Sequence, residues 1–217
     1  MSDCSIYDIT AIMVVYKTPD LVKVAYESFR KFYPTVPLII VDNSEGDDCT
    51  YYVTSLKRRD EFLTIAAPEK NIGHGKGLHV GILMARTKLC YVFDSDTEMY
   101  EGGMLEGMLE LMDSKTYGIG LLIRTDNRGN LAKEGIAYLT IARALINKDV
   151  YLCYSPLIEH GAPLLLAMIE IDGTEIQLKK FPVGQYVNHF ERGTRDRFGI
   201  PLWEKGDIVK YTRVIKI

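Results

Sequence analysis

Short apolar runs alternate along the first half of the chain with segments whose apolar positions recur at helical spacing. Runs rich in branched and aromatic residues predict buried strands over residues 8–16, 37–41, 62–66, 89–93 and 117–123. Helical spacing predicts helices over residues 19–32, 49–57, 77–86 and 104–112. The first of these helices has Thr18 at its N-cap and Pro19 at its first position. The alternation predicts an α/β fold with a Rossmann-like, mostly parallel central sheet flanked by helices.

The second half of the chain is less regular. Its pattern predicts strands over residues 137–142, 176–181 and 185–189, a short helix over 147–152, and an apolar helix that runs through Met168. The tail, residues 206–217, alternates enough to form an edge strand or a docking segment. Because there is no internal repeat or linker, the length of 217 residues predicts a single domain over residues 1–217.

Composition excludes several classes of function. Hydrophobic residues make up 47% of the chain and charged residues 25%, and the formal net charge of −3 points to neither nucleic acid nor an anionic membrane surface. The 4 cysteines lack metal-ligand or C-x-x-C spacing, which indicates a reducing compartment without disulfides. The start of the chain does not resemble a signal peptide, and no run approaches the ~18 apolar residues of a membrane span. We therefore expect a soluble, cytoplasmic protein.

The acidic segment Asp94-Ser95-Asp96 follows the predicted strand 89–93 directly. In open α/β sheets, ligands bind at the carboxyl ends of the strands. Two carboxylates one residue apart can direct oxygens at one small volume, which suits a hard ion such as Mg²⁺ or Mn²⁺ that also binds substrate phosphates. The pattern predicts a metal–diphosphate site at Asp94 and Asp96. The alternative is a polar turn that caps the following helix.

Polar residues also follow other predicted strands. Lys17 comes after the first strand and Asp42 after the second, as Asp94 comes after the fourth. Because the carboxyl ends of parallel strands lie at one edge of a sheet, these three residues should share a substrate-facing rim.

Several segments together resemble glycosyltransferase family 2, whose members bind nucleotide sugars with the GT-A fold. The matching segments are V-V-Y-K-T-P-D-L (14–21), V-D-N-S (41–44), N-I-G-H-G-K-G (71–77) and F-D-S-D-T-E (93–98). The second half is more loosely similar to short members with an H-G-A-P segment (160–163) and a late H-x-x-x-G-T-R segment (189–195). The resemblance implies a nucleotide-sugar-binding half over about residues 1–100 and an acceptor-binding half over about residues 101–217.

The resemblance assigns the nucleoside to the first three strand ends. Tyr16 and Lys17 would line the base pocket, and Asp42 would accept a hydrogen bond from a base imide such as uracil N3–H, which favours a UDP-sugar. Asp42 can equally be a turn or helix-cap residue. Asn71 and Gly73 would wrap the nucleoside, since glycine permits close approach of the backbone.

The resemblance also assigns the diphosphate and its ion. Asp94 and Ser95 would contact the donor, Asp94 and Asp96 would hold Mn²⁺ or Mg²⁺, and His189 would be a further ligand if its strand ends beside them. Lys76 would lie near the phosphates. Alternatively, His189 would be a structural histidine and Lys76 a solvated surface lysine. Arg195 or Arg192 would clamp the diphosphate in bidentate fashion or lie on the surface.

The implied reaction is transfer of a sugar to a hydroxyl group of a glycan, lipid-linked or other acceptor, with inversion at the anomeric carbon. The ion would neutralise the leaving nucleoside diphosphate, and a base would deprotonate the acceptor. The acidic base segment of many family members is missing, and Glu159 and His160 stand at the corresponding place. Either would be the base, with His160 favoured, or both would only orient the acceptor loop.

Other interpretations use the same features. The G-x-G-x-G of residues 73–77 does not follow the first strand, which argues against a dinucleotide-binding oxidoreductase. A sugar nucleotidyltransferase would share the fold class, but its Gly-rich basic loop after the first strand is missing. A catalytically silent module that binds nucleotide sugars or glycans remains open because the acidic base segment is absent.

Overall fold

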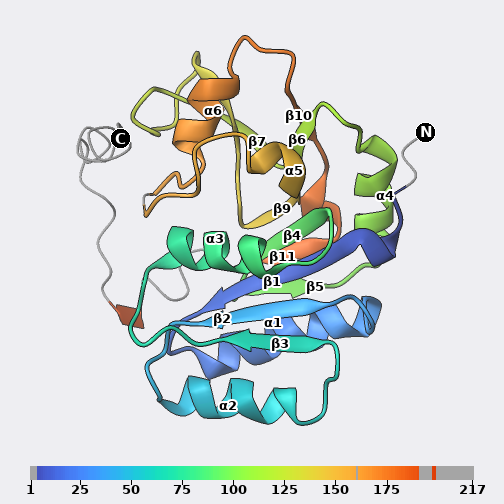
Figure 1. Cartoon of the computed structure of the whole chain (residues 1–217), viewed down its shortest axis with the longest axis vertical. Coiled ribbons are helices and arrows are strands. Elements are labelled where there is room, and N and C mark those ends of the chain that lie inside the picture. The colour runs from blue at the N-terminus through green and yellow to red at the C-terminus, as the bar shows by residue number, and fades with distance from the viewer. Residues whose placement is uncertain (1–3, 160, 191–196, 199–217) are drawn as a thin grey trace.

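The computed structural model describes residues 4–159, 161–190 and 197–198 and has helices on both faces of a large sheet (Figure 1). The strands are β1 (Ile9–Val15), β2 (Leu38–Asp42), β3 (Leu63–Ala66), β4 (Leu89–Asp94), β5 (Thr97–Met99), β6 (Thr116–Gly120), β7 (Leu122–Thr125), β8 (Ile136–Leu139), β9 (Arg143–Asn147), β10 (Gln177–Lys180) and β11 (Val187–His189). The helices are α1 (Pro19–Phe32), α2 (Asp48–Lys57), α3 (His74–Met84), α4 (Met104–Leu111), α5 (Lys148–Tyr151) and α6 (Leu165–Ile171), with 3₁₀ turns at Ile6–Asp8 and Val183–Gln185.

The main sheet has seven strands in the order β10-β6-β9-β4-β1-β2-β3. β1 pairs with β2 and β4 in parallel, and β2 pairs with β3 in the same way. β9 lies between β4 and β6 and is antiparallel to both. The predicted α/β fold with a mostly parallel sheet is therefore confirmed.

Two apolar cores lie on opposite faces of this sheet. Residues of β1 alternate between them, because successive side chains of a strand point to opposite faces. One core packs β1 against α1, α2 and α4, and the other packs it against α3, α5 and α6. All seven residues of β1 are buried, as expected of a central strand covered on both sides.

Helix α3 approaches β1 closely because two glycines face the strand. A Cβ atom on Gly77 would lie 2.9 Å from a methyl group of Val14, and one on Gly81 would lie 2.4 Å from a methyl group of Ile12. A larger residue at Gly81 would require the side chain of Ile12 or the helix to shift. This close packing fixes the start of α3 relative to the carboxyl ends of β1 and β4.

Some predicted elements differ from the observed ones. The run 117–123 is two strands, because the chain leaves the main sheet after Gly120, and β7 pairs with β8 in a separate two-stranded sheet. Helix α3 begins at His74, three residues earlier than predicted. The strand predicted over 185–189 is only Val187–His189, preceded by a 3₁₀ turn. Residues 206–217 lie outside the described residues.

Two details of the predicted helix starts and strands also need correction. Thr18 is at the N-cap of α1 with Pro19 following, but its side chain makes no capping hydrogen bond. The short strands β5 and β9 were not predicted. β9 follows the strand predicted over 137–142, which is observed as β8 at Ile136–Leu139.

Candidate active site

The polar strand ends lie at one edge of the main sheet. In the parallel ladder, Val15 pairs with Asp42 and Val14 pairs with Asp94, so β1, β2 and β4 end at the same level. Lys17 follows β1 at this edge. The predicted rim formed by Lys17, Asp42 and Asp94 is present.

The acidic segment after β4 forms a tight turn. Asp94 is the last residue of β4, and its carbonyl oxygen accepts a hydrogen bond of 2.8 Å from the hydroxyl of Thr97. The carbonyl oxygen of Asp96 accepts a hydrogen bond of 2.9 Å from the backbone N–H of Phe190. Ser95 and Asp96 are both buried. These contacts fix the backbone of the turn that carries the two carboxylates.

His189 reaches this turn through the antiparallel pairing of β11 with β5. The register places Val187 opposite Met99 and His189 opposite Thr97. As a result, Nε2 of His189 lies 3.1 Å from Oδ1 of Asp96 and 3.3 Å from Oδ2 of Asp94. Arg143, the first residue of β9, also supports β11, because Nη1 donates a hydrogen bond of 2.7 Å to the carbonyl oxygen of Val187. No pattern in the sequence indicated this role of Arg143.

The two carboxylates determine the charge of His189. Burial by itself lowers the pKa of the imidazole, but hydrogen bonds and charge from Asp94 and Asp96 outweigh it and raise the pKa to about 9. Without a cation, His189 is therefore protonated at neutral pH and bridges the two carboxylates. A cation at this position would take the place of that proton.

Asp94, Asp96 and His189 fit a divalent ion. They offer ligand atoms that all lie within 4.8 Å of one another. Adjacent ligands in an octahedral shell with bonds of ~2.1 Å lie roughly 3 Å apart, close to the 3.1 and 3.3 Å separations of the His189 nitrogen from the two carboxylates. Two carboxylates and an imidazole are a donor set that Mn²⁺ accepts. These three residues are a possible metal site.

The strand ends beside this turn are held in strained conformations. Lys17 and Glu45 have positive φ angles of 54° and 61°. The N–H of Lys17 donates to the hydroxyl of Ser44 at 3.0 Å, and a carboxylate oxygen of Glu45 accepts from the N–H of Asn71 at 3.0 Å. Lys17 also lies over the ring of Tyr16, with Nζ 5.2 Å from the centroid. Because strained residues persist only where their surroundings hold them, the rim is preorganised.

Asp42 is occupied by contacts within the chain. Its buried carboxylate accepts hydrogen bonds from the N–H of Ser44 at 2.9 Å and from the hydroxyl of Thr50 at 2.6 Å. These contacts match the turn role that the sequence left open for Asp42. Its contact with a uracil imide stays a prediction.

The glycine-rich start of α3 packs against the Ile158–Glu159 segment. Gly73 has φ +89°, and a Cβ atom there would lie 2.2 Å from Oε2 of Glu159. A Cβ atom on Gly75 would lie 2.1 Å from the carbonyl oxygen of Ile158. Oε2 of Glu159 also accepts a hydrogen bond of 3.0 Å from the N–H of Gly75. The absence of side chains at Gly73 and Gly75 therefore lets the Ile158–Glu159 segment pack directly against the start of α3. This packing places the carboxylate of Glu159 at the positive end of the helix dipole.

The other residues predicted to bind the donor are exposed or lie outside the described residues. Asn71 is exposed, and its side-chain oxygen accepts a hydrogen bond of 2.8 Å from the N–H of Gly73. Lys76 is exposed on α3. His160, Arg192 and Arg195 lie outside the described residues, so their predicted roles stay predictions.

Two histidines of α3 have different surroundings. Nε2 of His74 lies 3.4 Å from Oδ1 of Asp94, which places this residue beside the acidic turn. His74 was not predicted as a site residue, because no spacing pattern links a residue in the first turn of α3 to Asp94. Nδ1 of His79 instead lies 2.7 Å from the hydroxyl of Tyr151, which accepts the N–H of Leu157 at 3.1 Å. His79 therefore anchors the segment that leads to Glu159.

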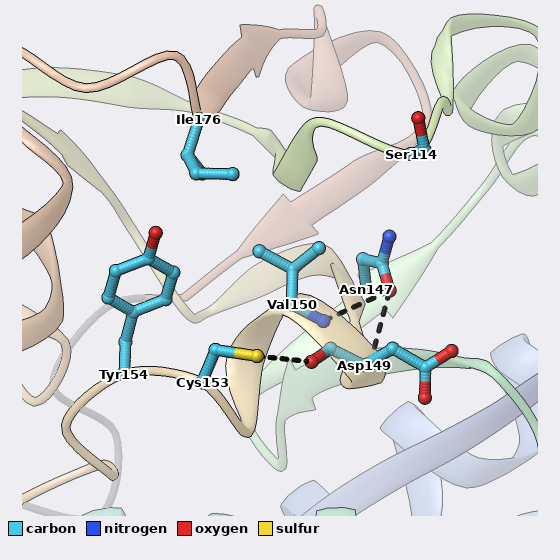
Figure 2. A pocket seen from close by; sticks show the side chains of 7 residues that line it. All are labelled: Ser114, Asn147, Asp149, Val150, Cys153, Tyr154 and Ile176. Atoms are coloured by element: carbon cyan, nitrogen blue, oxygen red, sulfur yellow. Dashed lines mark hydrogen bonds between the residues drawn. The ribbon is translucent and has the colours of Figure 1, made fainter.

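A hollow of about 340 Å³ lies at the opposite edge of the sheet (Figure 2). It is lined by Ser114, Asn147, Asp149, Val150, Cys153, Tyr154 and Ile176. Asn147 pairs with Leu89 at the amino end of β4, one strand length from Asp94. Its side-chain oxygen caps α5 by accepting from the N–H groups of Asp149 and Val150. Ligands of open α/β sheets bind at the other edge, so this hollow is separate from the candidate site.

Searches of known proteins place this architecture among the glycosyltransferases. A mannosyltransferase from Pyrobaculum calidifontis, solved with GDP-Man and Mn²⁺, superposes with a TM-score of 0.66 at 14% identity, covering 81% of this chain and 55% of that one. Residues 1–349 of TarS from S. aureus superpose with a TM-score of 0.58 at 14% identity, covering 82% and 59%. The chain thus spans little more than half the length of these neighbours. The fold is the GT-A glycosyltransferase fold.

The sequence itself identifies the family. The profile of glycosyl transferase family 2 matches residues 10–154, which is more than half of the chain. The chain belongs to glycosyl transferase family 2, as its motifs predicted. No curated protein matches the chain significantly. Within the described residues, no helix is both long and apolar enough to cross a membrane.

Proposed function

We propose that this protein transfers a sugar from a nucleoside-diphosphate sugar to a hydroxyl group of a glycan, lipid-linked or other acceptor, with inversion at the anomeric carbon. One observation carries the proposal. His189 comes from a distant part of the chain and meets Asp94 and Asp96 at the carboxyl edge of the sheet, with ligand atoms within 4.8 Å of one another. This edge is where an open α/β sheet binds its ligands.

Asp94, Asp96 and His189 would hold Mn²⁺ or Mg²⁺. A bound ion would supply Lewis-acid assistance by neutralising charge on the departing nucleoside diphosphate. The chain contributes the rest of the donor site. Tyr16 and Lys17 offer an aromatic ring and an ammonium group at the end of β1, and Ser95 lies between the two carboxylates.

The base of the donor can be tested directly. The sequence favours uridine through Asp42, but the carboxylate of Asp42 bonds to Ser44 and Thr50. The neighbouring mannosyltransferase was solved with a guanosine donor. UDP-sugars and GDP-sugars therefore both belong in the assay.

The protein should release a nucleoside diphosphate from its donor only when Mn²⁺ or Mg²⁺ is present. The assay incubates purified protein with a panel of UDP- and GDP-sugars, with the ion or with chelator, and measures the nucleoside diphosphate released. A thermal-shift series with the same compounds reports binding separately, because a ligand of the folded state raises the melting temperature. Binding without release would favour a silent nucleotide-sugar-binding module. Neither binding nor release with any donor would contradict the proposal.

Glu159 and His160 can be separated as candidate bases. The carboxylate of Glu159 already accepts the N–H of Gly75, and the amide oxygen of a glutamine can accept the same bond. We therefore expect Glu159→Gln to keep transfer within about threefold, whereas loss of a general base costs roughly 10²–10⁴-fold. His160→Ala should show that larger loss. Both variants are compared in steady-state kinetics, and a collapse of turnover in Glu159→Gln alone would instead assign the base to Glu159.

A further inference from the structure

His74 occupies the first position of α3, and its imidazole faces the acidic turn. Nε2 of His74 lies 3.4 Å from Oδ1 of Asp94. The other oxygen of the same carboxylate, Oδ2, lies 3.3 Å from Nε2 of His189. The carboxylate of Asp94 is therefore bracketed by two imidazoles, one beside each oxygen.

The backbone around His74 is held on both sides. The carbonyl oxygen of Gly73 accepts a hydrogen bond of 3.1 Å from the side-chain amide of Asn43, and the N–H of Gly75 donates to Glu159 at 3.0 Å. The close packing of Gly77 and Gly81 on β1 fixes the helix that follows. His74 thus projects from a fixed backbone, which is what a residue needs if it is to orient a neighbour.

The geometry points to His74 as a positioning residue of the cation site. This inference rests on the proposed function, because it concerns the ion that Asp94, Asp96 and His189 would hold. The 3.4 Å contact between Nε2 of His74 and Oδ1 of Asp94 is an ion-pair distance and not a formed hydrogen bond. With an ion bound, an N–H of His74 would donate to Oδ1 and hold the carboxylate plane of Asp94 so that Oδ2 faces Asp96 and His189. Carboxylates that bind metals are commonly oriented by such hydrogen-bonding partners, and removing one lowers metal affinity by roughly 10–100-fold.

His74 stands apart from the ligand set itself. The group of ligand atoms within 4.8 Å consists of Asp94, Asp96 and His189 among the residues that the structure describes, and His74 is not one of its members. Its side chain is 38% exposed, compared with 19% for His189. His74 therefore acts on the site through Asp94.

The test measures Mn²⁺ affinity without substrate, by electron paramagnetic resonance of free Mn²⁺ or by calorimetry. His74→Ala should weaken Mn²⁺ binding by roughly 10–100-fold and leave the melting temperature of the metal-free protein unchanged. His74→Gln should restore affinity to within about threefold, because the amide nitrogen of glutamine can take the place of Nε2 as a donor. His79→Gln is the matched control on the same helix, and its Mn²⁺ affinity should equal that of the wild type.

The outcomes separate this inference from the proposed function. If Asp96→Asn loses Mn²⁺ binding and His74→Ala binds like the wild type, the site stands and the role of His74 is overturned. If His74→Ala and His74→Gln are equally weak, His74 does not act as a hydrogen-bond donor, and the positioning role is also overturned. If Asp96→Asn binds Mn²⁺ like the wild type, the cation site itself is wrong.

Discussion

Asp96→Asn should abolish sugar transfer and leave the protein folded. The substitution keeps the size of the side chain but removes one of the two negative charges that would hold the cation. Metal ions contribute several kcal/mol to stabilising charge in a transition state, and ~1.4 kcal/mol corresponds to a factor of ten in rate. We therefore expect turnover to fall by at least about a thousandfold. Steady-state assays with saturating donor and Mn²⁺, together with circular dichroism of the variant, check this result.

Asp113→Asn provides the matched control. Asp113 precedes β6 at the opposite edge of the sheet. A hydrogen bond from Lys179 and a weaker contribution from Thr116 lower the pKa of its carboxyl to about 2. Its side chain is half exposed, so neutralising it should leave turnover and Mn²⁺ affinity at wild-type values. If Asp96→Asn turned over at the wild-type rate with Mn²⁺ present, the Asp94–Asp96 turn would have no role in the reaction.

Mn²⁺ should bind more tightly as the pH rises toward 9. The pKa of His189 is raised to about 9 in the folded protein, so an incoming ion must displace a proton at lower pH. Apparent affinity should increase by up to about tenfold per pH unit between pH 6.5 and 9 and then level off. Calorimetric titrations across this range measure the affinity and the proton released.

The stability of the metal-free protein should change with pH in the opposite direction, falling as the pH rises. The folded pKa of His189 lies above the usual histidine value of 6.5, so protonation of His189 stabilises the folded state. This contribution to stability is complete below pH 6.5 and is lost as the pH rises through 9. His189→Gln has no such proton, so both trends should disappear in that variant. A wild-type Mn²⁺ affinity that does not change with pH would show that His189 is not a ligand.

The sequence was most informative where long apolar runs form the centre of the sheet. The runs of β1 and β4 are long enough to distinguish buried strands from loops, and Asp94 and Asp96 follow from the end of β4. In contrast, β5 has only three residues and was not predicted, and β11 is two residues shorter than the strand predicted over 185–189. The strand that carries His189 could be placed beside the site only through the family resemblance.

Contacts between distant segments were beyond the reach of sequence patterns. The predicted contact of Gly73 with a nucleoside stays a prediction, but no sequence pattern indicated that the side chain of Glu159 occupies the space where a Cβ atom of residue 73 would lie. Neither the approach of His74 to Asp94 nor the support that Arg143 gives to β11 leaves a local signal. These contacts depend on how α3 and β9 pack on the sheet, which is a property of the whole fold.

The pairing of β11 with β5 has a consequence for the order in which the protein is built. Asp96 and His189 are 93 positions apart, so translation must reach His189 before the three side chains of the candidate site can meet. An ion bound by both residues would reversibly close the loop between them, and closing a long loop lowers the entropy of the unfolded chain. A nascent chain that ends before β11 would therefore lack the third side chain of the candidate cation site.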